Sequence, residues 1–255
     1  MHVDLNSDLG ESWGAYELGA DADMLSIVSS ANVACGFHAG DPDVMRQTVI
    51  RARDGGVGIG AHPGYLDLWG FGRRKIAGDS LEEIEKQTAY QIGALMGVAA
   101  LEGAKVTHVK THGALGNLVA EDDGVAGAVA RAVKSVDPDL ILVVMPGMAT
   151  ERAAGVCGLR MAREIYADRA YQDNGNLVPR SQPGAVIHDA EEAADSVLRM
   201  LQEGAVITQS GKRIGGRIDT ICVHGDNPAA VGMARALRAS LEAAGVMIAP
   251  FHSFV

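Results

Sequence analysis

The fold is decided by stretches such as Val3-Asp4-Leu5-Asn6-Ser7-Asp8-Leu9-Gly10-Glu11, in which a short apolar run breaks into acidic and glycine residues. Four further apolar runs break in the same way, into Cys35-Gly36-Phe37-His38, Ala61-His62-Pro63-Gly64, His108-Val109-Lys110-Thr111-His112-Gly113 and His224-Gly225-Asp226. Parallel sheets and barrels carry their chemistry at the carboxyl ends of their strands. The sequence therefore predicts one site, assembled where several strand ends converge.

Strand and helix patterns alternate along nearly the whole chain. Helix-start signals occur at three points, namely a capping box at Ser80 with Glu83, Asp189, and Asn227 followed by Pro228. An Ala-rich amphipathic helix is expected over residues 121–134 and a β-hairpin over residues 206–218. Strands are expected over residues 3–6, 27–32, 57–60, 106–110, 140–145, 160–165, 219–223 and 246–249.

This alternation predicts an α/β fold with a parallel sheet, because parallel strands need a helix to cross over. The chain has 255 residues, and no linker rich in Pro, Ser or Gly divides it. We therefore expect one domain over residues 1–255, a closed or nearly closed (β/α) barrel of about seven strands, since such barrels commonly have this length. An open doubly wound sheet is the less favoured alternative.

The composition excludes several classes of partner. A formal net charge of −10 argues against non-specific binding to nucleic acid and to anionic membrane surfaces. The sequence contains no apolar run of about 18 residues and no basic-then-apolar leader at its start. Its three cysteines, Cys35, Cys157 and Cys222, form no CxxC pair, which is typical of a reducing compartment. These features predict a cytoplasmic protein.

The first strand supplies polar candidates on one face. Asp4, Asn6 and Asp8 have the same parity, so their side chains point to the same side of a strand. Burying three polar groups is costly unless they line a site. Asp8 is therefore a catalytic candidate, with Asp4 and Glu11 as weaker ones. The alternative is that Asp4 bonds the backbone and Asp8 caps the next turn.

Two histidines occupy equivalent positions after strands. His38 and His62 each precede a turn motif. A lone histidine is more often a hydrogen-bonded structural residue than a ligand, but two in matching positions favour a role in a site. Together with Asp8 they form a candidate triad for a divalent metal ion used in hydrolysis. No HExxH or other closely spaced metal signature supports this interpretation.

A third cluster contains a lysine between two histidines. His108, Lys110 and His112 have the same parity and would face one way on a strand. Lys110 in this setting is either an anion clamp or a base with a lowered pKa. Lys110 and His112 are expected in the site, whereas His108 could point outside if the strand ends earlier.

Further polar residues are expected to bind substrate. The arginines of Gly70-Phe71-Gly72-Arg73-Arg74 suit carboxylate or phosphate oxygens, with a solvated charge pair as the alternative. Residues 164–169 end another strand with charges that are expected to form an ion-pair set at the rim. Asp226 could instead cap the following helix. The expected substrate-binding residues are Asn6, Glu11, Asn32, Arg73, Glu164, Asp168, Arg169, His224 and Asp226.

Three familiar motifs are absent. The sequence contains no GxxxxGK[ST] phosphate loop, no GxGxxG after the first strand, and no GxSxG elbow. A serine hydrolase of the α/β type is therefore disfavoured. A nucleotide, if used, would bind without a standard motif or be held by a partner.

Taken in order, these stretches resemble the LamB/YcsF family, which includes the A subunit of bacterial 5-oxoprolinase. The family usually has Lys-Pro-His-Gly-Ala-Leu-Tyr-Asn where this chain has Thr111 in place of the Pro and Gly116 in place of the Tyr. The resemblance runs from end to end and is carried by residues 3–11, 31–42, 60–65, 70–74, 90–95, 108–115, 167–169 and 222–226.

The resemblance implies an irregular (β/α) barrel of the glycoside hydrolase and deacetylase type. It also implies ATP-dependent opening of 5-oxoproline to L-glutamate, with Mg²⁺ accompanying ATP, in a complex with B and C subunits. Two other classes stay open: a metal-dependent deacetylase acting on a carbohydrate amide without ATP, and a non-catalytic subunit that only binds the lactam or its partners. A homo-oligomer is also left open. The expected catalytic residues are Asp8, His38, His62, Lys110 and His112.

Overall fold

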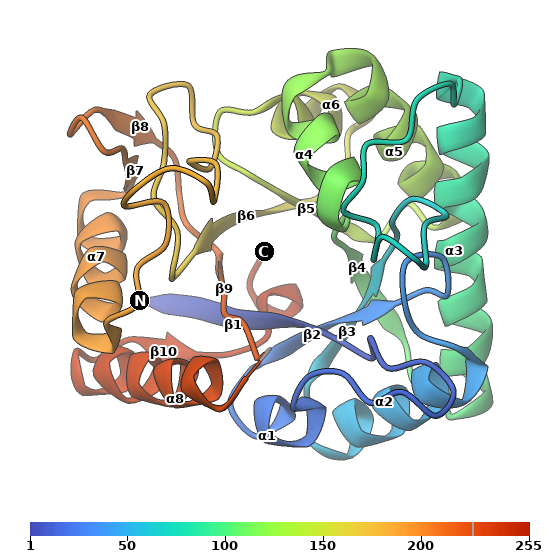
Figure 1. The fold of residues 1–255 in the computed structure, drawn as a ribbon, viewed down its shortest axis with the longest axis horizontal. Helices are drawn as coiled ribbons and strands as arrows, with labels where there is room; N and C mark the ends of the chain where they lie inside the picture. Colours follow the sequence, from blue (N-terminus) through green and yellow to red (C-terminus); the bar gives the residue numbers. More distant parts are fainter. Residues whose placement is uncertain (226) are drawn as a thin grey trace.

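The computed structural model describes residues 1–225 and 227–255, so the predicted roles of Asp226 fall outside the described residues. Within that part of the chain, seven parallel strands close into a barrel, because β9 pairs with both β6 and β1 (Figure 1). The predicted barrel is therefore confirmed, and the open sheet is excluded. The barrel strands are, in spatial order, β1 (His2–Leu9), β2 (Ser30–Ala34), β3 (Gly58–His62), β4 (Val106–Val109), β5 (Ile141–Val144), β6 (Met161–Tyr166) and β9 (Thr220–Cys222).

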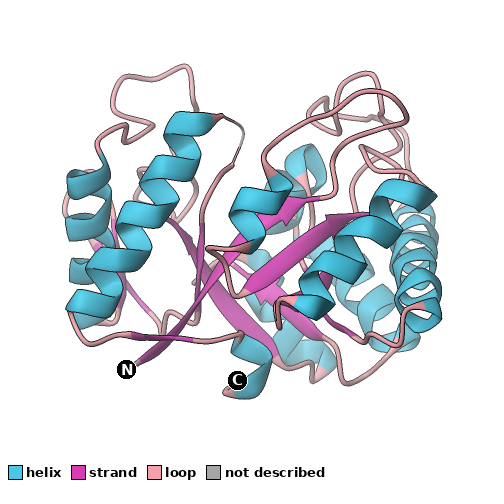
Figure 2. Cartoon of the chain, turned by 90° about the horizontal axis from the view of Figure 1, so that it is seen from below, coloured by secondary structure: helices cyan, strands magenta, loops and turns pink. Residues whose placement is uncertain are grey.

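Helices follow most of the strands and cover the outside of the barrel (Figures 1 and 2). They are α1 (Asp21–Leu25), α2 (Pro42–Asp54), α3 (Leu81–Leu101), α4 (Gly113–Glu121), α5 (Asp123–Val136), α6 (Ala149–Cys157), α7 (Ala190–Glu203) and α8 (Pro228–Ala243). The helix starts predicted at Ser80, Asp189 and Asn227 are confirmed as the N-caps of α3, α7 and α8.

The helix predicted over residues 121–134 is corrected to two helices. Helix α4 ends at Glu121, and α5 begins at Asp123. Asp122 separates them, because its side chain accepts hydrogen bonds from the N–H groups of Gly124 and Val125 and so starts a new helix.

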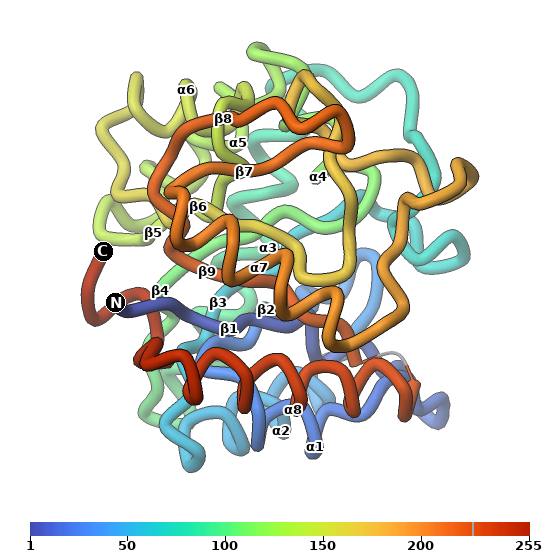
Figure 3. The backbone as a smooth tube through the Cα atoms, turned by 90° about the vertical axis from the view of Figure 1, so that its left-hand side faces the viewer, coloured from blue at the N-terminus to red at the C-terminus, as the bar shows by residue number. Residues whose placement is uncertain are grey.

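Three short strands lie outside the barrel. β7 (Ala205–Ile207) and β8 (Arg213–Gly215) form the predicted antiparallel hairpin. It lies on the same side of the molecule as the neighbouring helices α7 and α8 (Figure 3). β10 (Met247–Ile248) pairs with the start of β1.

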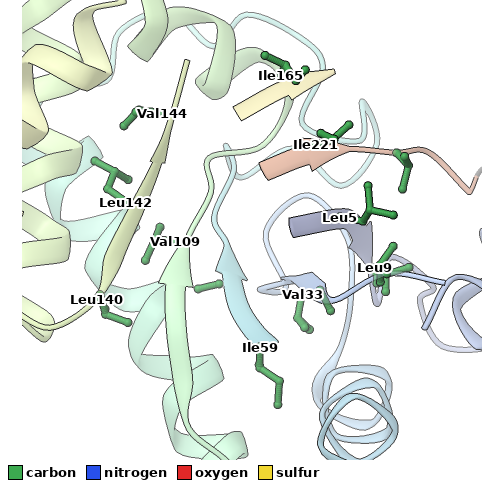
Figure 4. Close-up of a cluster of buried hydrophobic side chains, with 14 of the residues drawn as sticks. Leu5, Leu9, Val33, Ile59, Val109, Leu140, Leu142, Val144, Ile165 and Ile221 are labelled. Carbon is green, nitrogen blue, oxygen red and sulfur yellow. The ribbon is translucent and has the colours of Figure 1, made fainter. Parts of the chain in front are cut away.

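The first barrel strand, β1, alternates between an apolar outer face and a polar inner face. In β1, Leu5 and Leu9 are buried among apolar residues of the other strands, as Figure 4 shows. Asn6, between them, bonds Thr220 on the neighbouring strand β9 and Glu164 on the next strand, β6. This period of two explains why the strands read as apolar while the interior can hold a polar site.

The amino end of the barrel is closed by the end of the chain. Phe251, in a short 3₁₀ helix (Phe251–Ser253), is fully buried and packs against Ile141, Val143 and Ala162. The C-terminus accordingly lies within the ring of strands in Figure 1. The long loops gather at the opposite end (Figure 2), so the polar interior opens only toward the carboxyl ends of the strands.

No helix within residues 1–225 and 227–255 has both the length and the apolar character needed to cross a bilayer.

Candidate active site

Lys110 lies at the centre of the candidate site, directly after β4. Its Nζ lies 2.8 Å from Glu164 Oε1 and 3.1 Å from Asp8 Oδ1. The same ammonium group donates to Asn6 Oδ1 and to Cys222 Sγ, each at 3.1 Å. Side chains from β1, β4, β6 and β9 therefore converge on one buried cation.

The surroundings of Lys110 settle its charge. Burial opposes ionisation, but the negative charge of Asp8 and the other acidic groups outweighs it and raises the pKa of Lys110 well above its usual value. Of the two alternatives for this residue, an anion-binding cation is favoured over a base with a lowered pKa.

Asp8 connects Lys110 to a group of histidines. Its Oδ1 also accepts a hydrogen bond from Asn32 Nδ2 at 2.9 Å, and its Oδ2 lies 3.2 Å from His62 Nε2. Burial alone would raise its pKa, but the charges of His62 and Lys110 hold the pKa of Asp8 well below its usual value. The side chain remains 24% exposed. Asp8 is thus an ionised carboxylate within reach of solvent.

Two backbone carbonyls fix the orientation of two histidine rings. A carbonyl oxygen can only accept, so His62 Nδ1 donates to Lys110 O at 2.7 Å, and His112 Nε2 donates to Phe71 O at 2.8 Å. The remaining nitrogens, His62 Nε2 and His112 Nδ1, then face each other at 3.1 Å. Each of these two atoms also has an acidic neighbour, since His62 Nε2 lies 3.2 Å from Asp8 Oδ2 and His112 Nδ1 lies 3.7 Å from Glu11 Oε1.

His38 completes the group. Its ring stacks on that of His112, with 3.7 Å between centroids and 5° between planes, and its Nε2 lies 3.3 Å from Glu11 Oε1. Burial and the neighbouring His112 and His62 hold the pKa of His38 well below its usual value. Burial and His62 likewise lower the pKa of His112 to about 3. Both rings are therefore neutral near pH 7, as metal ligands must be.

Glu11, His38, His62 and His112 form a cluster that could hold a metal ion. Each offers one ligand atom, and these atoms all lie within 4.8 Å of one another. Imidazoles and a carboxylate suit zinc and related divalent ions, and carbonyl partners commonly orient such histidines. The triad of Asp8, His38 and His62 stays a prediction; the cluster shares His38 and His62 with it and adds Glu11 and His112, whereas Asp8 lies beside the cluster with its Oδ2 3.2 Å from His62 Nε2.

The loop after β3 closes against the histidines. Gly72 has φ +62°, and a Cβ there would lie 2.7 Å from His38 Cβ and 2.8 Å from His112 Cδ2, so only glycine lets the backbone approach. Arg73, an expected substrate-binding residue, is exposed, with its guanidinium carbon 5.0 Å from the Phe71 ring centroid. It lies at the edge of the histidine group.

A second polar layer supports the site from below. Asn32 Nδ2 donates to Asn6 Oδ1 at 2.8 Å, and His108 Nε2 lies 3.1 Å from Asn32 Oδ1. The possibility that His108 points outside is wrong, because its ring is fully buried inside the barrel. Gly60 makes room for it, since a Cβ there would lie 2.0 Å from His108 Nε2.

The residues expected at the rim do not form one ion-pair set, which corrects that prediction. Glu164 pairs with Lys110, and Asp168 Oδ2 lies 2.9 Å from His224 Nδ1. Arg169 instead donates to the carbonyl oxygens of Val178 and Ala185. Arg169 lies beyond β6, which ends at Tyr166, so strand alternation no longer sets its direction, and its guanidinium group turns toward the carbonyl oxygens of the following loop.

Sequence reasoning missed Tyr166 as part of the site, and it placed Cys222 near the site without giving it a role. The Tyr166 ring centroid lies 5.3 Å from Lys110 Nζ, and Cys222 Sγ bonds the same atom. The parity of the strands could have identified both, since Tyr166 is two residues after Glu164, and Cys222 is two residues before His224.

A model of the LamB/YcsF family matches residues 3–255. The chain belongs to this family. A relative from Rhodopseudomonas palustris, named as the A subunit of 5-oxoprolinase, is 57% identical over 98% of this chain and 99% of its own. That name describes the relative as one component of a multi-subunit enzyme.

Solved structures agree with the family assignment. The lactam utilization protein from Thermus thermophilus superposes with a TM-score of 0.92 at 48% identity, covering 98% of this chain and 99% of that one. The catalytic domain of a peptidoglycan N-acetylglucosamine deacetylase from Eubacterium rectale has a TM-score of 0.50 at 11% identity, covering 98% and 87%. This second likeness concerns the fold alone.

Proposed function

We propose that this protein is the A subunit of a 5-oxoprolinase, which opens 5-oxo-L-proline to L-glutamate with hydrolysis of ATP. The observation that carries the proposal is the ionised Asp8 held beside the buried cation Lys110 at the mouth of the barrel. Full-length similarity to relatives named as the A subunit of 5-oxoprolinase supports the choice of substrate.

The chemistry explains why ATP would be needed. A five-membered lactam is a stabilised amide, so its carbonyl carbon is a poor electrophile. Transfer of the terminal phosphate of ATP to the lactam oxygen activates the carbonyl carbon, and a first water adds to that carbon. The C–N bond then breaks, the ring nitrogen leaves as the amine, and a second water hydrolyses the resulting acyl phosphate to glutamate and phosphate. The overall reaction consumes the lactam, ATP and two water molecules and yields glutamate, ADP and phosphate.

In this scheme the two central residues have distinct tasks. Lys110 stabilises negative charge on the lactam oxygen or its phosphate, because a preformed cation in a dry site is strongly effective there. Asp8 accepts the proton of the attacking water, a role that contributes about 100- to 10,000-fold in rate. His62 orients Asp8 through the 3.2 Å contact.

The proposal includes partner subunits. The sequence has no standard phosphate-binding loop. We therefore assign the nucleotide, with its Mg²⁺, to a site completed by the B and C subunits that the family resemblance implies.

A second candidate is metal-dependent amide hydrolysis without ATP, as in a carbohydrate deacetylase. It is favoured by the cluster of Glu11, His38, His62 and His112. A divalent ion bound there would polarise a carbonyl oxygen and lower the pKa of a water molecule. The orientation of His62 and His112 toward each other is fixed by Lys110 O and Phe71 O and does not depend on the ion.

The deciding experiment measures glutamate from 5-oxoproline with and without ATP, for the chain alone and with its B and C partners. Asp8→Asn and His62→Ala should each reduce ATP-coupled glutamate formation at least 100-fold, since each disrupts the group that activates water. Arg131→Ala is the matched control, because the exposed Arg131 pairs with Glu85 on the outer helices, away from the barrel interior. Full activity of both site variants would refute the assignment.

Metal analysis and calorimetry distinguish the two alternative functions, a metal-dependent deacetylase and a non-catalytic subunit. A deacetylase requires a stoichiometric divalent ion, loses activity with chelator, and hydrolyses an N-acetylated sugar without ATP. A non-catalytic subunit binds 5-oxoproline in calorimetry, yet Asp8→Asn leaves turnover of the rebuilt complex unchanged. Each result replaces the 5-oxoprolinase proposal by the corresponding alternative.

A further inference from the structure

A cavity of about 270 Å³ lies beside the candidate active site. Its wall is formed by the ends of β6 and β9, by residues 180–188 and by the first turns of α8. Asp168 and His224 lie on the strand side, Arg180 and His188 lie on the loop side, and Met233 contributes apolar surface from α8. The volume is near the lower limit of known small-molecule sites, which suits a metabolite rather than a polymer.

The described wall of this cavity carries one permanent positive charge, on Arg180, and one carboxylate, on Asp168. Arg180 is exposed and forms no ion pair within 4.0 Å among residues 1–225 and 227–255. Asp168, the nearby carboxylate, is already bonded to His224. Arg169 lies behind the wall with its donors committed to backbone carbonyls.

The two guanidiniums repel each other. Burial lowers the pKa of Arg169, and the charge of Arg180 lowers it further. Two neighbouring arginines that repel each other are unusual in a chain whose net charge is −10. Guanidinium groups match the oxygens of carboxylates and phosphates, so an oxyanion on Arg180 would relieve the repulsion.

The cavity is connected to the active site through one side chain. The ring of Tyr166 stacks on that of His224, with 6.4 Å between centroids, and its other neighbour is Lys110, 5.3 Å from the ring centroid. Tyr166 therefore lies between Lys110 and the His224 side of the cavity.

We propose that this cavity is an oxyanion subsite, in which Arg180 binds the carboxylate or phosphate group of a small ligand whose reacting end lies at Lys110. The oxyanion could come from the carboxylate of a cyclic amino-acid amide or from a nucleotide phosphate. The choice of the lactam as ligand rests on the proposed function, whereas the subsite itself does not.

Calorimetry on the full-length chain tests the proposal with four probes: L-5-oxoproline, 2-pyrrolidinone, ATP and inorganic phosphate. The first two share a ring and differ by the carboxylate. Arg180→Ala should weaken binding of 5-oxoproline at least tenfold if the carboxylate occupies the subsite, or that of ATP and phosphate if a phosphate does. Binding of 2-pyrrolidinone should not change, and Arg131→Ala should bind every probe as the parent chain does. Because Arg180 is exposed, its loss should leave the melting temperature unchanged.

The outcomes separate the subsite from the proposed function. The subsite is overturned if Arg180→Ala binds every anionic probe as tightly as the parent chain does. It is also overturned if no anionic probe binds the parent chain. If the complex rebuilt with Arg180→Ala hydrolyses 5-oxoproline with the KM values of the parent complex for both 5-oxoproline and ATP, the subsite fails and the function stands. If Arg180→Ala loses anion binding but no complex forms glutamate, the function fails and the subsite stands.

Discussion

Replacing Lys110 by methionine should destabilise the protein strongly. The methionine keeps the bulk of the side chain but leaves the carboxylates of Asp8 and Glu164 without their cation, 3.1 and 2.8 Å from the position that Nζ occupied. The side chains of Lys110 and Glu164 are only 5% and 3% exposed, so water cannot replace the lost partner. Removing one member of a buried pair costs about 3–5 kcal/mol in the free energy of unfolding.

Urea unfolding at pH 7 measures this cost, and for a chain of this size it corresponds to a fall of roughly 6–20 °C in melting temperature. Glu164→Gln provides the second arm of a double-mutant cycle, because glutamine keeps the oxygen that accepts from Asn6 Nδ2 and removes the charge. The double variant Lys110→Met/Glu164→Gln should be more stable than Lys110→Met alone. A Lys110→Met protein within about 1 kcal/mol of the parent, or a double variant with no recovery, would refute the account of Lys110 as a cation shared by two buried carboxylates.

Two further predictions concern glycine geometry and pH. Gly72→Ala should weaken Co²⁺ binding at least tenfold more than Gly78→Ala in a spectroscopic titration, since both have positive φ but only the first places a Cβ against His38 and His112; equal effects would contradict the close approach. Burial raises the pKa of Asp4 to about 6, above its unfolded value, so stability should fall as the pH rises from about 4 to 6 and then level off. Asp4→Asn should flatten that part of the stability–pH curve in urea unfolding, and an unchanged slope would show that Asp4 does not titrate there.

The barrel could be predicted from local patterns because each of its strands is short, apolar on one face and followed by a helix. The parity of Asp4, Asn6 and Asp8 placed all three inside the barrel, where they contact other strands. The first residues of the helices could also be predicted, because a capping side chain bonds backbone groups within a few residues of its own position. Both kinds of signal depend only on residues that are close in sequence, so they can be recognised without knowledge of the tertiary structure.

Contacts that depend on the register between strands could not be predicted from the sequence. Nothing in the sequence indicates that Glu164 reaches Lys110 rather than Arg169, because the closed barrel sets that pairing. The same limit applies to the metal-binding cluster, in which Glu11 and His112 stand where the sequence favoured Asp8. A loop residue such as Glu11 acquires its partner only when the loop closes.

The interior of the barrel has an apolar base and a charged mouth. This arrangement strengthens the electrostatic interactions of the charged groups in the site. At the base, Phe251 packs on Ile141 and Val143 and excludes water. At the mouth, Lys110 and Asp8 are held by neighbours that are themselves buried and hydrogen-bonded. A charge above an apolar plug has water on one side only, so its field is weakly screened toward the mouth. The charge of Lys110, shared between Asp8 and Glu164, is therefore weakly screened on the side where the reaction would occur.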